Sequence, residues 1–303
     1  MIHYHSLKEA EEVFKALSAP VRIEIMELIS RNDHMSMSDL AETLGITNSA
    51  VSMHVSKLEN AGLIKIQTTT GKRGIMKFVR PCHDRLVVEM ARQIPEANCY
   101  QDEIDIGWYI GVDAHPTCGI ATETKIIGEF DNPSVFSYPE HIGAGILWIG
   151  YGSVSYSLPN RLQAGQRLRE LQLSFEISSE CPEFNEDYPS DIHLSINGIS
   201  IGKWISPGDF GGRMGIFSPL WWPEILNQYG LLKTIRITDH GTFMDGDFLL
   251  SNVCVGDLGI DYNSNIELTF AVPKDTPNCG GMTLFGKGFG DYNQSIRVKV
   301  YYD

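Results

Sequence analysis

The sequence predicts two domains of different class, an N-terminal winged helix-turn-helix with a β-hairpin wing and a C-terminal all-β sandwich of jelly-roll type. Helical apolar periodicity fills the first third of the chain, whereas short β-rich runs separated by Gly, Pro, Asn and Asp turns fill the rest. The 303 residues, 43% of them hydrophobic, suffice for two cores. We expect domains at 1–95 and 104–303, joined by a polar linker at 96–103.

Two helices with a tight turn between them are predicted near the middle of the first domain, over 38–44 and from Thr47 onward. Gly45 supplies the positive φ angle that such a turn needs, and Thr47 is a suitable N-cap. Apolar residues recur at i, i+4 and i+7 along the second helix, which indicates one buried stripe and a helix-turn-helix spacing. The stripe consists of Val51, Val55 and Leu58.

The opposite face of the second helix carries short or flexible polar side chains. An exposed helix that only stabilises itself usually carries Glu and Lys pairs, whereas a helix that enters the major groove of DNA needs side chains that let it approach base edges. The pattern therefore predicts a DNA-reading helix. Its predicted DNA-contacting residues are Asn48, Ser49, Ser52, Met53, His54, Ser56 and Lys57.

Two strands follow this helix, over 63–69 and 75–80, and a glycine-flanked basic loop at 70–74 joins them as a wing. Residues 47–80 hold six basic residues and one acidic residue, a net charge of 6 − 1 = +5. Phosphate groups are the natural counter-charge, and the charge disfavours the alternative of a winged helix used for protein contacts. The wing residues predicted to contact DNA are Lys72 and Arg73.

Two stretches carry a resemblance to a known family. KALSAPVRIEIMELISR spans 15–31, with Pro20 and Arg22 at the opening of a helix, and DLAETLGITNSAVSMHVSKLENAGLI spans 39–64. Together they resemble the ArsR/SmtB family of winged-helix bacterial repressors over the first third of the chain. The resemblance implies a homodimer that places two recognition helices in successive major grooves of a palindromic double-stranded DNA operator.

The resemblance also implies a dimer interface formed by the first helix and by the helix after the wing. Apolar stripes predict these helices at 7–17 and 84–93. The family often senses metals, but residues 35–37 are Met-Ser-Met where a Cys pair would lie, and Cys-His-Asp at 82–84 are adjacent and cannot all face one ion on a helix. We therefore expect no metal site and no cofactor.

Charge and cysteine content bound the class of protein. The formal net charge is −14, with 12 basic and 12 acidic residues in 1–100 and 12 basic and 26 acidic residues in 101–303, so the second part should not bind nucleic acid by itself. Six cysteines without a CxxC pair suit reduced thiols. Residues 1–14 lack the apolar core of a secretory signal, and the longest apolar run, 142–151, is too short to span a bilayer. We expect a cytoplasmic protein without membrane contact.

The second domain resembles galactose-binding and carbohydrate-module sandwiches in its pattern of short strands, and Asn197-Gly198 predicts a hairpin inside it. Its most unusual segment is SPGDFGGRMGIFSPLWWP, residues 206–223, a long loop rich in aromatic residues. The functional interpretation is a pocket in which indole faces pack on a sugar while Asp and Arg bind its hydroxyls. The predicted ligand-binding residues are Trp204, Asp209, Arg213, Trp221, Trp222 and His240, with Trp148, Tyr156 and Asp291 as further candidates.

An alternative remains open at this loop, in which the tryptophans plug the end of the sandwich and Asp209 pairs with Arg213. Three function classes follow. The first is a DNA-binding repressor whose sandwich senses a small metabolite, expected to be a carbohydrate. The second is a carbohydrate-active enzyme with an attached DNA-binding domain, although no catalytic pair stands out among the acidic residues. The third is a sandwich used only for dimerisation or partner binding.

Overall fold

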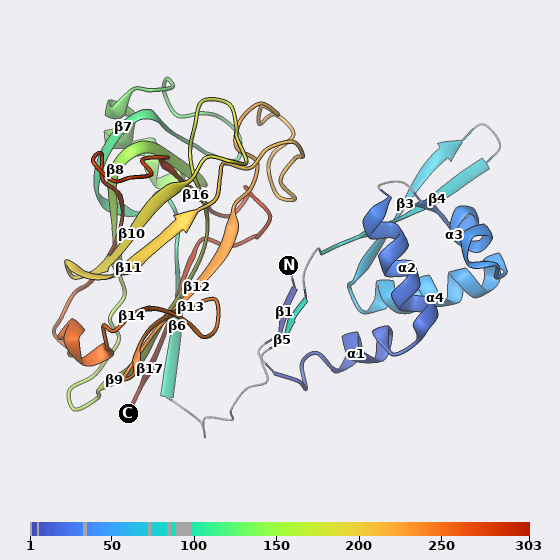
Figure 1. Ribbon diagram of the computed structural model, residues 1–303, viewed down its shortest axis with the longest axis horizontal. Helices are drawn as coiled ribbons and strands as arrows, with labels where there is room; N and C mark the ends of the chain where they lie inside the picture. Colours follow the sequence, from blue (N-terminus) through green and yellow to red (C-terminus); the bar gives the residue numbers. More distant parts are fainter. Residues whose placement is uncertain (1, 5, 33–34, 72–73, 84–85, 89–97) are drawn as a thin grey trace. The chain divides into compact units, whose positions relative to one another are not determined.

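The computed structural model describes residues 2–4, 6–32, 35–71, 74–83, 86–88 and 98–303 (Figure 1). The chain divides into two compact units, Met1–Pro95 and Glu96–Asp303, and each is described by itself. None of the helices in the described ranges combines the length and apolar character needed to cross a bilayer.

The first unit contains a helical cluster and small sheets. Its elements are β1 (Ile2–Tyr4), α1 (Glu11–Leu17), α2 (Pro20–Arg31), β2 (Met35–Ser36), α3 (Met37–Leu44), α4 (Asn48–Asn60), β3 (Ile64–Gly71), β4 (Gly74–Pro81) and β5 (Leu86–Val88). β3 and β4 form the predicted hairpin, and β2 extends it by pairing with β4.

Local residue choices explain why the helix-turn-helix forms. Ser36 and Asp39 make reciprocal side-chain to backbone hydrogen bonds at the start of α3, which is a capping box. Gly45 ends α3 in the left-handed conformation at φ 65°, and the Thr47 hydroxyl accepts the N–H of Ala50 at the start of α4. The predicted stripe of α4 is confirmed, since its residues are fully buried: Val51, Val55 and Leu58.

A buried arginine joins the first two helices. Arg22 of α2 is 6% exposed, and its guanidinium donates to the backbone carbonyls of Ala16 and Lys15 at the end of α1. These carbonyls lack partners within their own helix, so the arginine satisfies them and complements the helix dipole. The Pro20 and Arg22 pair that opens α2 therefore has a structural role.

Two predicted helices of this unit differ from the structure. α1 begins at Glu11, not at Leu7, and residues 86–88 form strand β5, not part of a helix over 84–93. β5 pairs in parallel with β1, and its sequence Leu-Val-Val favours a strand once a partner is present. The remainder of the predicted 84–93 helix lies outside the described residues.

The second unit is an antiparallel β-sandwich whose two sheets share a bridging strand. The first sheet has the order β7-β8-β15-β10-β11, the second has the order β6-β17-β9-β12-β13-β14, and β16 pairs with both β8 and β9. The strands are β6 (Asn98–Ile104), β7 (Tyr109–Ala121), β8 (Ile146–Leu158), β9 (Leu168–Ser178), β10 (Ser190–Ile196), β11 (Ile199–Ser206), β12 (Leu231–Thr238), β13 (Gly241–Met244), β14 (Phe248–Ser251), β15 (Ile266–Val272), β16 (Met282–Phe285) and β17 (Ile296–Tyr302).

Inward-facing residues of both sheets form the main core. Phe175 of β9 meets Phe270 of β15 edge to face across the sandwich, with ring centroids 4.8 Å apart. The predicted hairpin at Asn197-Gly198 is confirmed, since both residues have positive φ and Ile196 pairs with Ile199.

The expected linker at 96–103 is wrong from Asn98 onward, because these residues form β6. β6 pairs with β17, so that Asn98 lies opposite Tyr302 and Ile104 opposite Ile296. Figure 1 accordingly shows the start of β6 beside the C-terminus of this unit. A polar sequence suits this strand because its only pairing in the described structure is with β17, which leaves it at the edge of the sheet.

Candidate functional site

The outward face of α4 is polar and open to solvent. Met53 at its centre is 53% exposed, whereas His54 is half-buried and its Nδ1 atom has no hydrogen-bond partner among the described residues. His54 therefore contributes to the contact of α4 with the unit more than to its open face. The other predicted reading residues are all exposed: Asn48, Ser49, Ser52, Ser56 and Lys57.

The β3–β4 hairpin, which follows α4 in the chain, carries further positive charge. Lys65 of β3 and Lys77 of β4 are exposed, and the predicted wing residues Lys72 and Arg73 lie outside the described residues. The same-sign charge on α4 and on the hairpin is suited to phosphate groups of a duplex. Lys65 and Lys77 contributed to the predicted net charge of residues 47–80 but were not among the predicted contacts.

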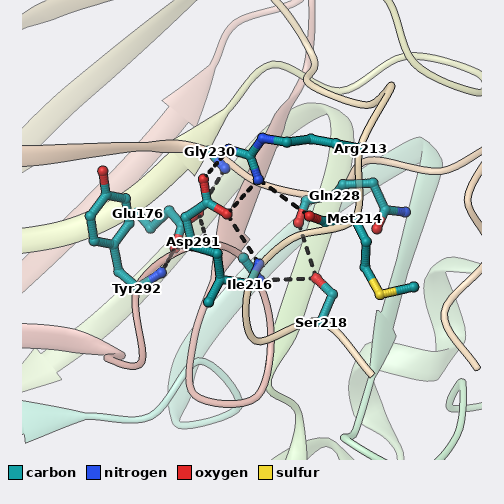
Figure 2. Close-up of polar contacts among 10 residues, drawn as sticks. Glu176, Arg213, Met214, Ile216, Ser218, Gln228, Gly230, Asp291 and Tyr292 are labelled. Atoms are coloured by element: carbon teal, nitrogen blue, oxygen red, sulfur yellow. Dashed lines mark hydrogen bonds and ion pairs between the residues drawn. The ribbon is translucent and has the colours of Figure 1, made fainter. Parts of the chain in front are cut away.

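In the second unit, Arg213 pairs with Asp291 and not with Asp209 (Figure 2). Its Nη1 lies 2.9 Å from Asp291 Oδ1, and its Nη2 contacts Oδ2, which makes a bidentate ion pair. The guanidinium carbon also lies 3.7 Å from the ring centroid of Tyr229. The alternative in which Asp209 pairs with Arg213 is therefore wrong, because Asp291 occupies both arms of the guanidinium.

Asp291 is nearly buried and joins the loop after β16 to the 206–223 loop. Its side chain is 7% exposed, and Oδ1 also accepts the backbone N–H of Ile216 at 3.1 Å. Its own backbone N–H donates to the carboxylate of Glu176 at 2.9 Å. Figure 2 shows Asp291 between the arginine of one loop and the strand carboxylate. One residue thus fixes the 206–223 loop to the segment after β16.

Glu176 of β9 is a fully buried carboxyl group that sequence reasoning missed. It accepts backbone N–H groups from Gly230, Asp291 and Tyr292, all within 3.1 Å. Burial raises the pKa of Glu176 to about 8, against the opposing effect of these donors. No local signal in the sequence predicts this burial, because β9 alternates apolar and polar residues and Glu176 falls on the polar face with Glu170 and Gln172.

Asp209 lies in a second buried acidic pair, with Glu180. Asp209 Oδ2 accepts the backbone N–H of Cys181 at 3.1 Å, whereas Oδ1 has no partner among the described residues. Glu180 accepts hydrogen bonds from the side chains of Asn227 and Thr283. Burial raises the pKa of Asp209 to about 7, and burial together with the charge of Asp209 raises that of Glu180.

The two adjacent tryptophans have different environments. Trp222 is 2% exposed, packs on Trp148 and Phe289, and donates Nε1–H to the carbonyl of Asn227. Trp221 is 38% exposed, and its Nε1–H donates to the carbonyl of Glu123 at 2.7 Å. Trp222 thus plugs the loop against the sheet, as one alternative expected, while Trp221 presents a fixed indole to solvent.

The remaining predicted ligand residues lie on other elements. Trp204 of β11 packs partly against the main core, with the Lys233 ammonium 4.6 Å from its ring centroid. His240 lies in the turn between β12 and β13, where its side chain is 83% exposed and 3.5 Å from Asp239. The structure therefore groups Arg213 with Asp291, and Trp221 with Trp222. Of the further candidates, Trp148 joins the tryptophan cluster and Tyr156 lies in the main core.

Within the described ranges, no three His, Cys, Asp or Glu side chains are arranged to hold a metal ion.

Comparison with known proteins finds similarity in the first unit. Residues 19–65 match the family model described as bacterial regulatory protein, arsR family. The chain is 29% identical over 89 residues to the uncharacterized HTH-type transcriptional regulator MJ1325 of Methanocaldococcus jannaschii, covering 29% of this chain and 94% of the relative. It is also 29% identical over 111 residues to the HTH-type transcriptional regulator NmtR of Mycobacterium tuberculosis, covering 37% of this chain and 82% of the relative.

Solved structures similar to the second unit are carbohydrate-binding modules. One is the CBM36-1 domain of a multidomain xylanase from the hindgut metagenome of Trinervitermes trinervoides, with a TM-score of 0.29 and 11% identity over 67% of this chain and 96% of that one. Another is the family 11 carbohydrate-binding module of Clostridium thermocellum, with a TM-score of 0.24 and 15% identity over 68% of this chain and 90% of that one. At these scores the likeness carries no argument about a ligand.

Proposed function

We propose that this chain, whose first unit is an arsR-family helix-turn-helix, is a dimeric transcriptional repressor whose β-sandwich senses a small polyhydroxylated molecule. The first unit supplies the DNA-reading surface. Exposed short side chains on α4 approach base edges, and the exposed lysines of α4 and of the hairpin contact phosphates.

The dimer is supported by apolar surface on the first two helices. Phe14 of α1 is 43% exposed, Ile23 of α2 is 46% exposed, and Leu7 just before α1 is 52% exposed. Exposed large apolar side chains are the residue type that a protein contact surface buries. Two copies joined there would present two α4 helices to a palindromic operator.

The sensing role rests on Trp221. Its Nε1–H is engaged by the Glu123 carbonyl, and its ring meets Trp222 edge to face at 5.7 Å, so the indole is held in one orientation while 38% exposed. A fixed indole face loses little conformational entropy when C–H groups of a sugar ring pack on it. Other apolar side chains between β11 and β12 are also exposed: Ile216, Phe217, Leu220 and Ile225.

The proposal is tested by a thermal-shift screen of the full chain against monosaccharides, disaccharides and sugar acids. A ligand should raise the melting temperature of the wild type and not that of Trp221→Ala. Trp108→Ala is the matched control, because Trp108 is 53% exposed in the same unit but lies in the turn between β6 and β7. Equal shifts for both variants and the wild type would remove Trp221 from the site.

The enzyme alternative is tested in the same samples. Any sugar that raises the melting temperature is recovered after overnight incubation and analysed by mass spectrometry and chromatography. A sensor returns the sugar unchanged, whereas a hydrolase or isomerase converts it. Release of a bound operator duplex by the same sugar, followed by fluorescence anisotropy, then separates a sensor from a sandwich that only binds a partner.

A further inference from the structure

The segment from Gly286 to Ser295 lies between two parts of the second unit that have different roles. It follows β16 and precedes β17, and it contacts both the loop that holds Arg213 and the edge strand β6. β6 is the first strand after residues 89–97, through which the chain passes from the first unit. Gly286–Ser295 is called the connecting loop below.

The middle of the connecting loop holds residues 213–218, called the Arg213 segment below. Asp291 makes the bidentate ion pair with Arg213 and accepts the backbone N–H of Ile216. The Asp291 carboxylate is 7% exposed, whereas the Arg213 side chain is 48% exposed. The arginine can therefore meet a ligand from solvent while its partner stays inside the protein.

Both ends of the connecting loop contact β6, through Ser295 at its end and Lys287 near its start. The Ser295 backbone N–H donates to Glu103 Oε1 at 2.7 Å, and its hydroxyl lies 3.0 Å from Asp105 Oδ1. Lys287 Nζ lies 3.1 Å from Glu103 Oε2. Burial opposes the charge on Glu103, but these donors hold its pKa below the ordinary value. β6 is thus fastened to the connecting loop as well as to β17.

The part of the connecting loop from Gly290 to Gln294 is tightly packed, which makes it a rigid link between Asp291 and Ser295. Glu176 holds the backbone N–H groups of Asp291 and Tyr292, and Gln294 Nε2 donates to Ser174 Oγ at 3.1 Å. Gly290 has φ 74°, and a Cβ atom there would lie 2.4 Å from the Glu176 carboxylate. A displacement of Asp291 is therefore transmitted to Ser295, because the packed residues between them cannot absorb it.

We propose that the connecting loop couples the Arg213 segment to β6, so that a ligand engaging Arg213 loosens the strand that leads into the second unit. The proposal rests on the proposed sensing function, and it assigns the regulation to Arg213, which lies on the same 206–223 loop as Trp221. A ligand that takes hydrogen bonds from Arg213 weakens the hold of Arg213 on Asp291. The ligand shifts the equilibrium only because it favours the state with the weakened pair.

The coupling is tested without any ligand, by hydrogen–deuterium exchange of the full chain. Asp291→Asn removes the ion pair and should raise amide exchange about fivefold to tenfold both in the Arg213 segment and in β6. Asp245→Asn is the matched control, because Asp245 also holds one lysine, Lys233, and one backbone N–H, that of Thr234, but in the β12–β13 region. It should leave β6 unchanged.

The second test starts from β6, because a coupling between two segments acts in both directions. Glu103→Gln, which removes the ion pair with Lys287, should raise exchange at residues 213–218. Asp102→Asn is its control on the same strand, because Asp102 pairs with Arg161 and not with the connecting loop. Arg213→Gln, at a half-exposed position, replaces Asp291→Asn if that variant unfolds.

The outcomes separate the two proposals. If Asp291→Asn raises exchange only in the Arg213 segment and Glu103→Gln raises it only in β6, the coupling is overturned whether or not a sugar binds. If each variant raises exchange in both the Arg213 segment and β6, the coupling is supported even if the sugar screen fails, since no sugar is present in the experiment. Equal exchange at β6 in Asp291→Asn and Asp245→Asn also counts against it.

Discussion

At the scale of single residues, the buried carboxyl pair of Asp209 and Glu180 makes the stability of the fold depend on pH. Asp209 is fully buried, one of its oxygens has no hydrogen-bond partner among the described residues, and Glu180 adds a second acidic group nearby. Burial of an acid without a compensating cation favours the protonated form, and the pKa of Asp209 is raised to about 7. Its ionisation therefore opposes folding.

The sign of the pH dependence follows from this shift. Between the ordinary Asp pKa near 4 and the raised value of about 7, the folded protein keeps a proton that the unfolded chain has lost. The free energy of unfolding therefore falls as pH rises through this window. Glu176, whose pKa is about 8, acts in the same direction and extends the fall to higher pH.

Asp209→Asn should remove part of this pH dependence and raise stability at pH 8. The amide keeps an acceptor for the Cys181 N–H and adds N–H donors in place of the unpaired oxygen. Because one pKa unit corresponds to about 1.4 kcal/mol, the shift from about 4 to about 7 sets an upper limit of about 4 kcal/mol on the gain. The measurement is chemical denaturation of the full chain at several pH values from 5 to 8.

The exposed residue Asp187, in the loop before β10, provides the control for this substitution. Asp187→Asn should leave the slope of stability against pH unchanged. If the free energy of unfolding of Asp209→Asn fell with pH as steeply as that of the wild type, Asp209 would be ionised in the folded protein throughout this range, contrary to the argument from burial.

At the scale of elements, α4 and α1 carry the functional expectations of the first unit. Lys57→Ala, on the exposed face of α4, should weaken binding to specific and random duplexes alike and reduce the slope of log affinity against log salt by about one. Fluorescence anisotropy with a duplex selected from a random-sequence pool measures both. Lys125→Ala, an exposed lysine of the second unit, should change neither, and an unchanged slope for Lys57→Ala would place α4 away from the phosphates.

Phe14→Asp tests the dimer at α1. Phe14 is 43% exposed, so the charge does not disturb the folded monomer, but in an apolar interface it would be buried without a partner. The variant should sediment as a monomer at concentrations at which the wild type is dimeric. Phe248→Asp is the control, since Phe248 is 68% exposed on β14 of the second unit, and a dimeric Phe14→Asp would move the interface elsewhere.

The sequence predicted elements whose causes are local. The turn at Gly45, the stripe of α4 and the hairpin at Asn197-Gly198 depend on residues a few positions apart, and the structure contains each of them. Strand β5 was missed because it depends on β1, which is more than eighty residues away in sequence.

The candidate ligand site shows the same division. The sequence identified the 206–223 loop from its aromatic content, but it could not distinguish the core residue Trp222 from the exposed residue Trp221. The partner of Arg213 is Asp291, 78 residues away, and the loop is fastened through Glu176 on a third segment. Such contacts depend on the order of strands in the sandwich, which local patterns do not encode.

At the scale of the whole molecule, charge is divided unevenly along the chain. Residues 1–100 are neutral in formal charge, with 12 basic and 12 acidic residues, whereas residues 101–303 carry 12 basic and 26 acidic residues. An acidic domain tethered to a DNA-binding domain repels the duplex and lowers its local concentration at the reading surface. We therefore expect the second unit to weaken binding to random sequences, whatever it senses.

A fragment of residues 1–95 should bind a random duplex more tightly than the full chain at low salt, by about tenfold, because the repulsion has been removed. The difference should vanish above about 0.3 M salt, where the screening length falls to roughly 6 Å and long-range repulsion is suppressed. The measurement is anisotropy of a labelled random duplex over a salt series, with circular dichroism to confirm that the fragment is folded. A difference that persists at high salt would show that the second unit blocks the DNA-binding surface by contact, and not by its charge.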